Sequence, residues 1–256
     1  FVACRCGFST EEEFVLLIMT EVPHLPYAEG LDVGAFSNGL QYYVWAHPEP
    51  AGYCEFRLFV AVGSWFEADG ESGLAHFVEH MAFKSTSRFQ EQGEVIRFLE
   101  GKGAQYGHDL NASTGLLETV YTFQIPVRSG LEDLTDGIAV LAEWAFGIRA
   151  AHHDVESERP VILEEWRGKR GARERLKAKY WHEAVLPRVA ARFPIGDPAV
   201  IGSASPSTVQ AFYRKWYRPE FMGVAVIGDF AGCESARIVA KISELFDLPR
   251  SLEDAP

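Results

Sequence analysis

The segment 72–83 constrains this chain more than any other, because an apolar run there encloses His76, Glu79 and His80. Two histidines four residues apart are neighbours on a helix surface, so both imidazoles can bind one metal ion. Glu79 precedes the second histidine, and from there its carboxylate can serve as a general base on water. Burying three titratable groups together without a cation is costly. The segment therefore predicts a zinc helix and, with it, zinc-dependent peptide hydrolysis.

A catalytic zinc site needs a third protein ligand and an open position for water. The best source is the segment 158–166, which contains Glu158, Glu164 and Glu165. At about 100° per residue, Glu158 and Glu165 share nearly the same helical face, whereas Glu164 points elsewhere. Pro160 lies between them and can kink this helix or force a start there. Two carboxylates on one face suit a ligand and a partner of a ligand, but spacing alone does not choose between Glu158 and Glu165.

Composition excludes two classes of partner and leaves the compartment open. Of 256 residues, 47% are hydrophobic and 23% charged, which is typical of a globular protein with a core. The net charge of −12 argues against nonspecific nucleic-acid binding, and no apolar run reaches the length of a membrane span. An acidic run precedes the apolar stretch 14–19, so we expect no signal peptide there. The four cysteines indicate no disulfide framework.

The rest of the pattern favours an α+β fold, because hairpin signals and separate helices occur without a strict βαβ alternation. Asn38-Gly39 between apolar runs predicts a hairpin, and Ser72 is the expected N-cap of the helix with the two histidines. We expect strands at 53–62, 105–111, 117–125 and 221–227, and helices at 91–100, 130–146, from 154, 206–217 and 233–246.

Seven segments match the motifs of one protein family: residues 36–43, 73–83, 110–114, 118–121, 158–166, 216–219 and 226–229. Together they resemble the pitrilysin/insulinase family of zinc peptidases, in which the metal motif reads H-x-x-E-H. The resemblance implies that Glu165 is the third zinc ligand and that Glu158 is a carboxylate beside the site. It also implies that Asn111 and Ala112 lie on an edge strand that pairs with extended substrate. The implied fold is an α+β roll, a mixed and largely antiparallel sheet with helices on one side.

The resemblance further implies the organisation of the chain. We expect a leader at 1–31, the peptidase domain at 32–250, and a tail at 251–256 that continues into further domains. Family enzymes close a chamber from repeated domains, so partners are peptide or unfolded polypeptide substrates and homologous domains in the same or another chain. The leading expectation is a zinc endopeptidase domain with one Zn²⁺. The alternative is a noncatalytic assembly or peptide-binding subunit of the same fold, or an inactive fragment that lacks its partner domains.

Overall fold

The computed structural model describes residues 27–169, 171–180, 189 and 191–246. The chain divides after Leu31, and the unit that begins at Asp32 carries the architecture described below. The leader expected at 1–31 lies outside the described residues up to position 26, and the tail expected at 251–256 lies outside them altogether.

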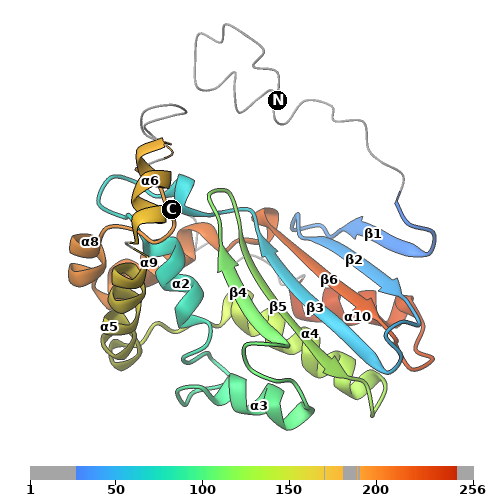
Figure 1. Ribbon diagram of the computed structural model, residues 1–256. Helices are drawn as coiled ribbons and strands as arrows, with labels where there is room; N and C mark the ends of the chain where they lie inside the picture. Colours follow the sequence, from blue (N-terminus) through green and yellow to red (C-terminus); the bar gives the residue numbers. More distant parts are fainter. Residues whose placement is uncertain (1–26, 170, 181–188, 190, 247–256) are drawn as a thin grey trace, which may run out of the picture. The chain divides into compact units, whose positions relative to one another are not determined.

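One open six-stranded sheet, with the order β1-β2-β6-β3-β5-β4, organises this unit (Figure 1). The strands are β1 Leu31–Ala35, β2 Gln41–Ala46, β3 Tyr53–Val60, β4 Leu110–Thr114, β5 Thr119–Pro126 and β6 Met222–Gly228. β2 pairs with β6 in parallel, whereas β3 pairs antiparallel with both β5 and β6, and β4 pairs antiparallel with β5. The sheet is therefore mixed and largely antiparallel, which confirms the expected fold class.

The two faces of the sheet differ because side chains alternate along each strand. On β3, Phe56 and Leu58 are fully buried, whereas Phe59 between Leu58 and Val60 is 43% exposed. Helices α4 (Leu131–Phe146) and α10 (Ser235–Phe246) lie behind the sheet in Figure 1 and cover its buried face. The ring of Phe56 stacks on Phe123 of β5 with centroids 5.0 Å apart, and Trp144 of α4 packs edge-on against Phe123. The core thus lies between the sheet and these two helices.

A second group of helices gathers at one end of the sheet, where α2 lies beside β4 (Figure 1). These helices are α2 Leu74–Met81, α5 His152–Gly168, α8 Pro198–Ser203 and α9 Pro206–Trp216. The remaining helical elements are α3 Glu94–Lys102, α6 Ala172–Tyr180, and the 3-10 turns η1 Ser64–Phe66 and η3 Pro219–Phe221. The group brings the segment with the two histidines and the segment with the two glutamates together at the sheet end.

Three local expectations need correction. The strand expected at 105–111 is shifted to Leu110–Thr114, because Oδ2 of Asp109 accepts from the backbone N–H of Gln105 and closes a turn before β4 begins at Leu110. Ser72 is not the N-cap of α2: Gly73 takes that position with φ 99°, which glycine adopts readily, and it has no side chain of its own to cap the helix. The helix α5 runs without a break through Pro160.

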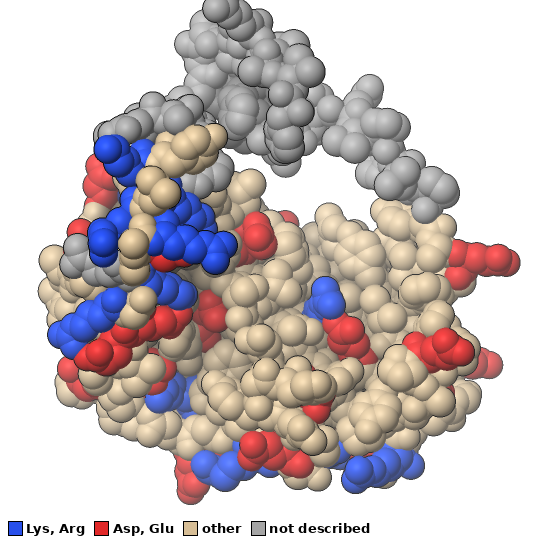
Figure 2. Space-filling model, viewed as in Figure 1, with Lys and Arg blue, Asp and Glu red and all other residues tan. Residues whose placement is uncertain are grey.

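Charge is unevenly distributed over the surface. Among the described residues, Arg173, Arg175, Lys177 and Lys179 of α6 are exposed, and Figure 2 shows Lys and Arg side chains gathered over this helix. The chain as a whole carries a net charge of −12, so α6 is locally of opposite sign. None of the helices described has both the length and the apolar character needed to cross a bilayer.

Candidate metal centre

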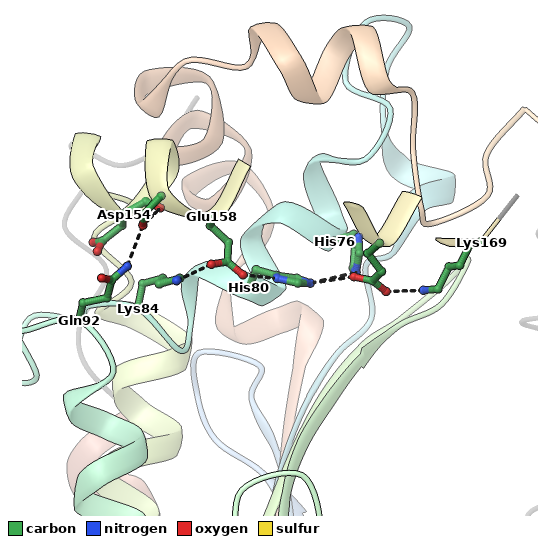
Figure 3. A network of polar contacts seen from close by, with 9 residues as sticks. His76, His80, Lys84, Gln92, Asp154, Glu158 and Lys169 are labelled. Atoms are coloured by element: carbon green, nitrogen blue, oxygen red, sulfur yellow. Dashed lines mark hydrogen bonds and ion pairs between the residues drawn. The ribbon is translucent and has the colours of Figure 1, made fainter. Parts of the chain in front are cut away.

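The two histidines of α2 face the same point in space. His76 and His80 lie one helical turn apart, and their Nε2 atoms are 3.2 Å from each other (Figure 3). Oε2 of Glu165, near the C-terminal end of α5, lies 3.5 Å from each Nε2. The structure therefore brings the expected donor atoms of His76, His80 and Glu165 together.

These donor distances fit a tetrahedral metal ion. Zinc binds imidazole nitrogen and carboxylate oxygen at about 2.0–2.2 Å, which places the ligand atoms of a tetrahedron roughly 3.3–3.6 Å apart. His76, His80 and Glu165 form the group of metal-ligating side chains found among the described residues. Lone pairs that converge in this way repel one another unless a cation or a proton lies between them. The residues thus fit a divalent cation with two nitrogen ligands and one oxygen ligand.

Glu158 orients His80 from the other side. Nδ1 of His80 donates to Oε1 of Glu158 over 2.7 Å, and the ammonium of Lys84 pairs with Oε2 of the same carboxylate (Figure 3). A proton held on Nδ1 leaves Nε2 free to bind a metal, the usual second role of a carboxylate near a metal-bound histidine. Burial raises the pKa of Glu158, but the hydrogen bonds from His80 and Lys84 outweigh it and bring the pKa below its usual range. Glu158 therefore stays ionised at neutral pH.

The surroundings shift the pKa values of the titratable groups of the site in opposite directions. Burial lowers the pKa of His76 to about 4, so its imidazole is neutral at pH 7, the form that binds metals. Burial also lowers the pKa of His80, but hydrogen bonds to Glu158 and Glu165 outweigh it and raise the pKa to about 9. The hydrogen bond from His80, with the ammonium of Lys169, lowers the pKa of Glu165 to about 2 in spite of burial. The surrounding carboxylates thus favour a positive charge at this point, which a metal ion can supply in place of the proton.

Glu79 lies on the same helix and is only 8% exposed. Its Oε2 accepts from the hydroxyl of Thr114 on β4 at 2.5 Å. Burial raises the pKa of Glu79, and the hydrogen bond from Thr114 opposes this shift. A carboxylate with a raised pKa beside a metal centre suits proton transfer near neutral pH.

The β4 strand forms the edge of the sheet beside the metal centre. The backbone N–H of Ala112 donates to the side-chain Oδ1 of Asn111 at 2.9 Å, so this N–H already has a hydrogen-bond partner. A cleft of about 430 Å³ runs past both residues and is also lined by the groups of the metal centre. Its apolar side is formed by Phe83, Ile96, Tyr106 and Leu110. The two expected substrate-strand residues, Asn111 and Ala112, therefore border the same cleft as the metal centre.

The sequence does not predict three polar contacts of this site. Thr114 holds Glu79, Lys84 pairs with Glu158, and Nζ of Lys169 lies 2.5 Å from Oε1 of Glu165. Lys169 follows Glu165 by four residues, so helical spacing contained a signal for that pair, whereas Lys84 lies beyond the end of α2 and meets Glu158 only through tertiary packing. Thr114 closes the segment 110–114, but its contact with Glu79 exists only because β4 packs against α2.

A comparison with protein-family models decides the family. The model described as Insulinase (Peptidase family M16) matches residues 42–189, more than half of the chain. The chain belongs to the insulinase family. The family resemblance seen in the sequence is confirmed.

Similar proteins within the insulinase family are named zinc proteases. "Zinc protease PQQL-like" of Arabidopsis thaliana is 38% identical over 228 residues, which cover 89% of this chain and 23% of that protein. The crystal structure of the first half of the periplasmic protease PqqL from Escherichia coli superposes with a TM-score of 0.79 and 34% identity, covering 88% of this chain and 47% of that one. Pitrilysin, at 18% identity and a TM-score of 0.68, shows the same fold. The chain thus spans less than a quarter of the length of the first curated relatives it matches.

Proposed function

We propose that this chain is the zinc-binding catalytic domain of an endopeptidase that cleaves peptides or unfolded polypeptide segments. The observation that carries the proposal is the convergence of His76, His80 and Glu165, with donor atoms 3.2–3.5 Å apart. A buried carboxylate, Glu79, and the edge strand β4 border the same cleft. Membership of the insulinase family and the names of the relatives support zinc as the metal.

Each residue of the site has a proposed role. His76, His80 and Glu165 hold the zinc ion, and Glu158 fixes the ring of His80 through Nδ1. When bound, zinc supplies a Lewis acid that acidifies water and polarises a carbonyl group. Glu79 accepts a proton from water as general base and then delivers it to the leaving amine. The hydroxyl of Thr114 holds the Glu79 carboxylate in place during both transfers.

The edge strand accounts for the substrate class. An extended peptide can add to β4 as a further strand, with main-chain hydrogen bonds to Asn111 and Ala112. The amide of Ala112 is occupied by Oδ1 of Asn111, so pairing requires this side chain to move aside. Backbone that is already paired in helices and sheets is not free to pair with β4, and this favours cleavage of peptides and unfolded segments.

The longer relatives support a proposal about domain organisation. We infer a peptidase domain at 32–250, a leader at 1–31 and a tail at 251–256 that leads into further homologous domains. The relative length of the curated proteins, about four times that of this chain, supports such domains in the same or another chain. Full activity then requires those domains, because they complete the substrate chamber.

The test combines metal content with cleavage of an unfolded polypeptide. We expect near-stoichiometric zinc in the purified protein, and its loss in His76→Ala, His80→Ala and Glu165→Ala. Glu79→Gln should keep zinc and lose cleavage by about 10²- to 10⁴-fold, measured with the longer protein that contains this chain. Glu164→Gln is the control, because Glu164 is an exposed glutamate of α5 outside the site. Cleavage unchanged in Glu79→Gln would exclude the general-base role, and peptide binding without any cleavage would favour the noncatalytic alternative.

A further inference from the structure

The helix α5 has little buried surface with which to fix its position. Of its residues, Asp154, Val155, Glu158 and Ile162 are buried. Pro160 has no backbone N–H, so the helical hydrogen bond to the carbonyl of Glu156 is missing in the turn that carries Glu158. A metal site tolerates errors of only about half an ångström in its ligands. Additional contacts must therefore set the position of Glu165 relative to α2.

The side chain of Arg159 supplies such contacts. Its Nη2 donates to the carbonyl of Ala204 at 2.8 Å, at the C-cap of α8, and its Nη1 donates to the carbonyl of Ile201. Nη2 also contacts the carboxylate of Glu156 on α5 at 2.7 Å. The guanidinium lies over the ring of Phe77 on α2, 6.0 Å from its centroid. Arg159 is 14% exposed and thus touches α5, α8 and α2 at once.

The helix α8 is itself attached to the beginning of α2. The backbone N–H of Asp197, the N-cap of α8, donates to the carbonyl of Ser72 at 3.2 Å. Gly196 lies so close that an added Cβ would be 2.4 Å from Cα of Gly73, the N-cap of α2. Ile201 of α8 is fully buried. The backbone of α8 therefore has a fixed position relative to the helix that carries both histidines.

We propose that Arg159 is a positioning residue for the metal centre. It fastens α5 to α8 and α2, and so sets the distance from Glu165 to His76 and His80. The inference rests on the proposed zinc site and assigns a role to a residue outside it. An arginine suits this role because its planar guanidinium can donate to two carbonyls from one fixed position, whereas a lysine ammonium is a single point.

The zinc dissociation constant measures this role directly. We expect Arg159→Ala to weaken zinc binding by about 10- to 100-fold, the usual effect of losing a group that orients a ligand. Arg159→Lys should restore part of the affinity. Arg167→Ala is the matched control, because Arg167 is an exposed arginine of the same helix whose guanidinium pairs with Glu164. Affinities are measured by competition with a chromophoric chelator. The visible absorption of bound Co²⁺ reports ligand geometry independently of activity, and it should change in Arg159→Ala but not in Arg167→Ala.

A role in general stability gives a different result. In that case Arg159→Ala lowers the unfolding temperature equally with and without zinc, while the zinc affinity and the Co²⁺ spectrum of the folded protein stay as in the parent chain. That outcome overturns the proposal. If Arg159→Ala does not fold, Arg159→Gln and Arg159→Lys are compared in the same way, and parental affinity in both also overturns it. Failure of the parent chain to bind zinc refutes the proposed function instead, so the two failures are distinguishable.

Discussion

Replacing Glu158 by glutamine tests whether this carboxylate strengthens the metal centre through His80. Glu158→Gln keeps the size of the side chain and an oxygen that can accept from Nδ1 of His80, but it removes the negative charge. It also takes away the partner of the Lys84 ammonium, which is partly exposed and can turn towards solvent. Nothing else in the contact between α2 and α5 needs to change.

The size of the effect follows from the type of hydrogen bond that is lost. The contact from Nδ1 of His80 to Oε1 of Glu158 is 2.7 Å long and involves an ionised acceptor. Such bonds contribute about 1.5–3 kcal/mol, compared with about 1 kcal/mol for a bond between neutral groups. The difference of about 0.5–2 kcal/mol corresponds to zinc binding that is roughly 2- to 30-fold weaker.

The assay is a zinc titration in competition with a chelator at constant pH and ionic strength. Glu164→Gln is the matched control, because it removes the same charge from the same helix at an exposed position that pairs with Arg167. Any effect of net charge alone then appears in both variants. A dissociation constant for Glu158→Gln within twofold of the Glu164→Gln value would refute the assigned role of Glu158.

Three further predictions concern stability. Burial raises the pKa of Glu67 from 4.5 to about 7, so between pH 4.5 and pH 7 the folded state binds more protons than the unfolded state. The free energy of unfolding should therefore fall by at most about 3 kcal/mol as the pH rises through this range. Glu67→Gln should flatten that slope in urea titrations, and equal slopes in variant and parent contradict the assignment. Gly196→Ala should cost more than Gly52→Ala by at least about 1 kcal/mol, because both residues have positive φ but only Gly196 abuts the backbone of Gly73; equal thermal shifts count against the close packing. Removal of zinc by a chelator should lower the unfolding temperature, because zinc at a free concentration 100 times its dissociation constant adds about 2.7 kcal/mol to the free energy of unfolding. An unchanged unfolding temperature argues against a metal that binds the folded state.

The sequence by itself determined which side chains are candidates for the metal centre and its base. Two histidines four residues apart with Glu79 between them fit one helix face, and a separation of seven residues puts Glu158 and Glu165 on one face of another. These relations are local, because helix geometry converts sequence spacing directly into direction. Strands with alternating burial and the helices 130–146 and 206–217 are local in the same sense, and the structure has them within a few residues. The α+β class follows from such patterns.

Only the tertiary structure decided which carboxylate faces which atom. Spacing left Glu158 and Glu165 equivalent, whereas packing of α5 against α2 brings Glu165 to both Nε2 atoms and Glu158 to Nδ1 of His80. Tertiary structure also decided which side chain caps the N-terminus of α2. The carboxylate of Glu67, 3% exposed, accepts from the backbone N–H of Ala75 at 3.0 Å, although sequence proximity favours Ser72.

The physical reason is that a contact between distant segments depends on the relative position of two elements, and no local pattern records that position. Thr114 reaches Glu79 because β4 packs against α2, and Arg159 reaches Phe77 because α5 packs against α2. The sequence by itself thus indicated the two histidines, two candidate carboxylates and Glu79 as a candidate base. Their common centre, and the side chains that hold them there, depend on how the helices pack at the end of the sheet.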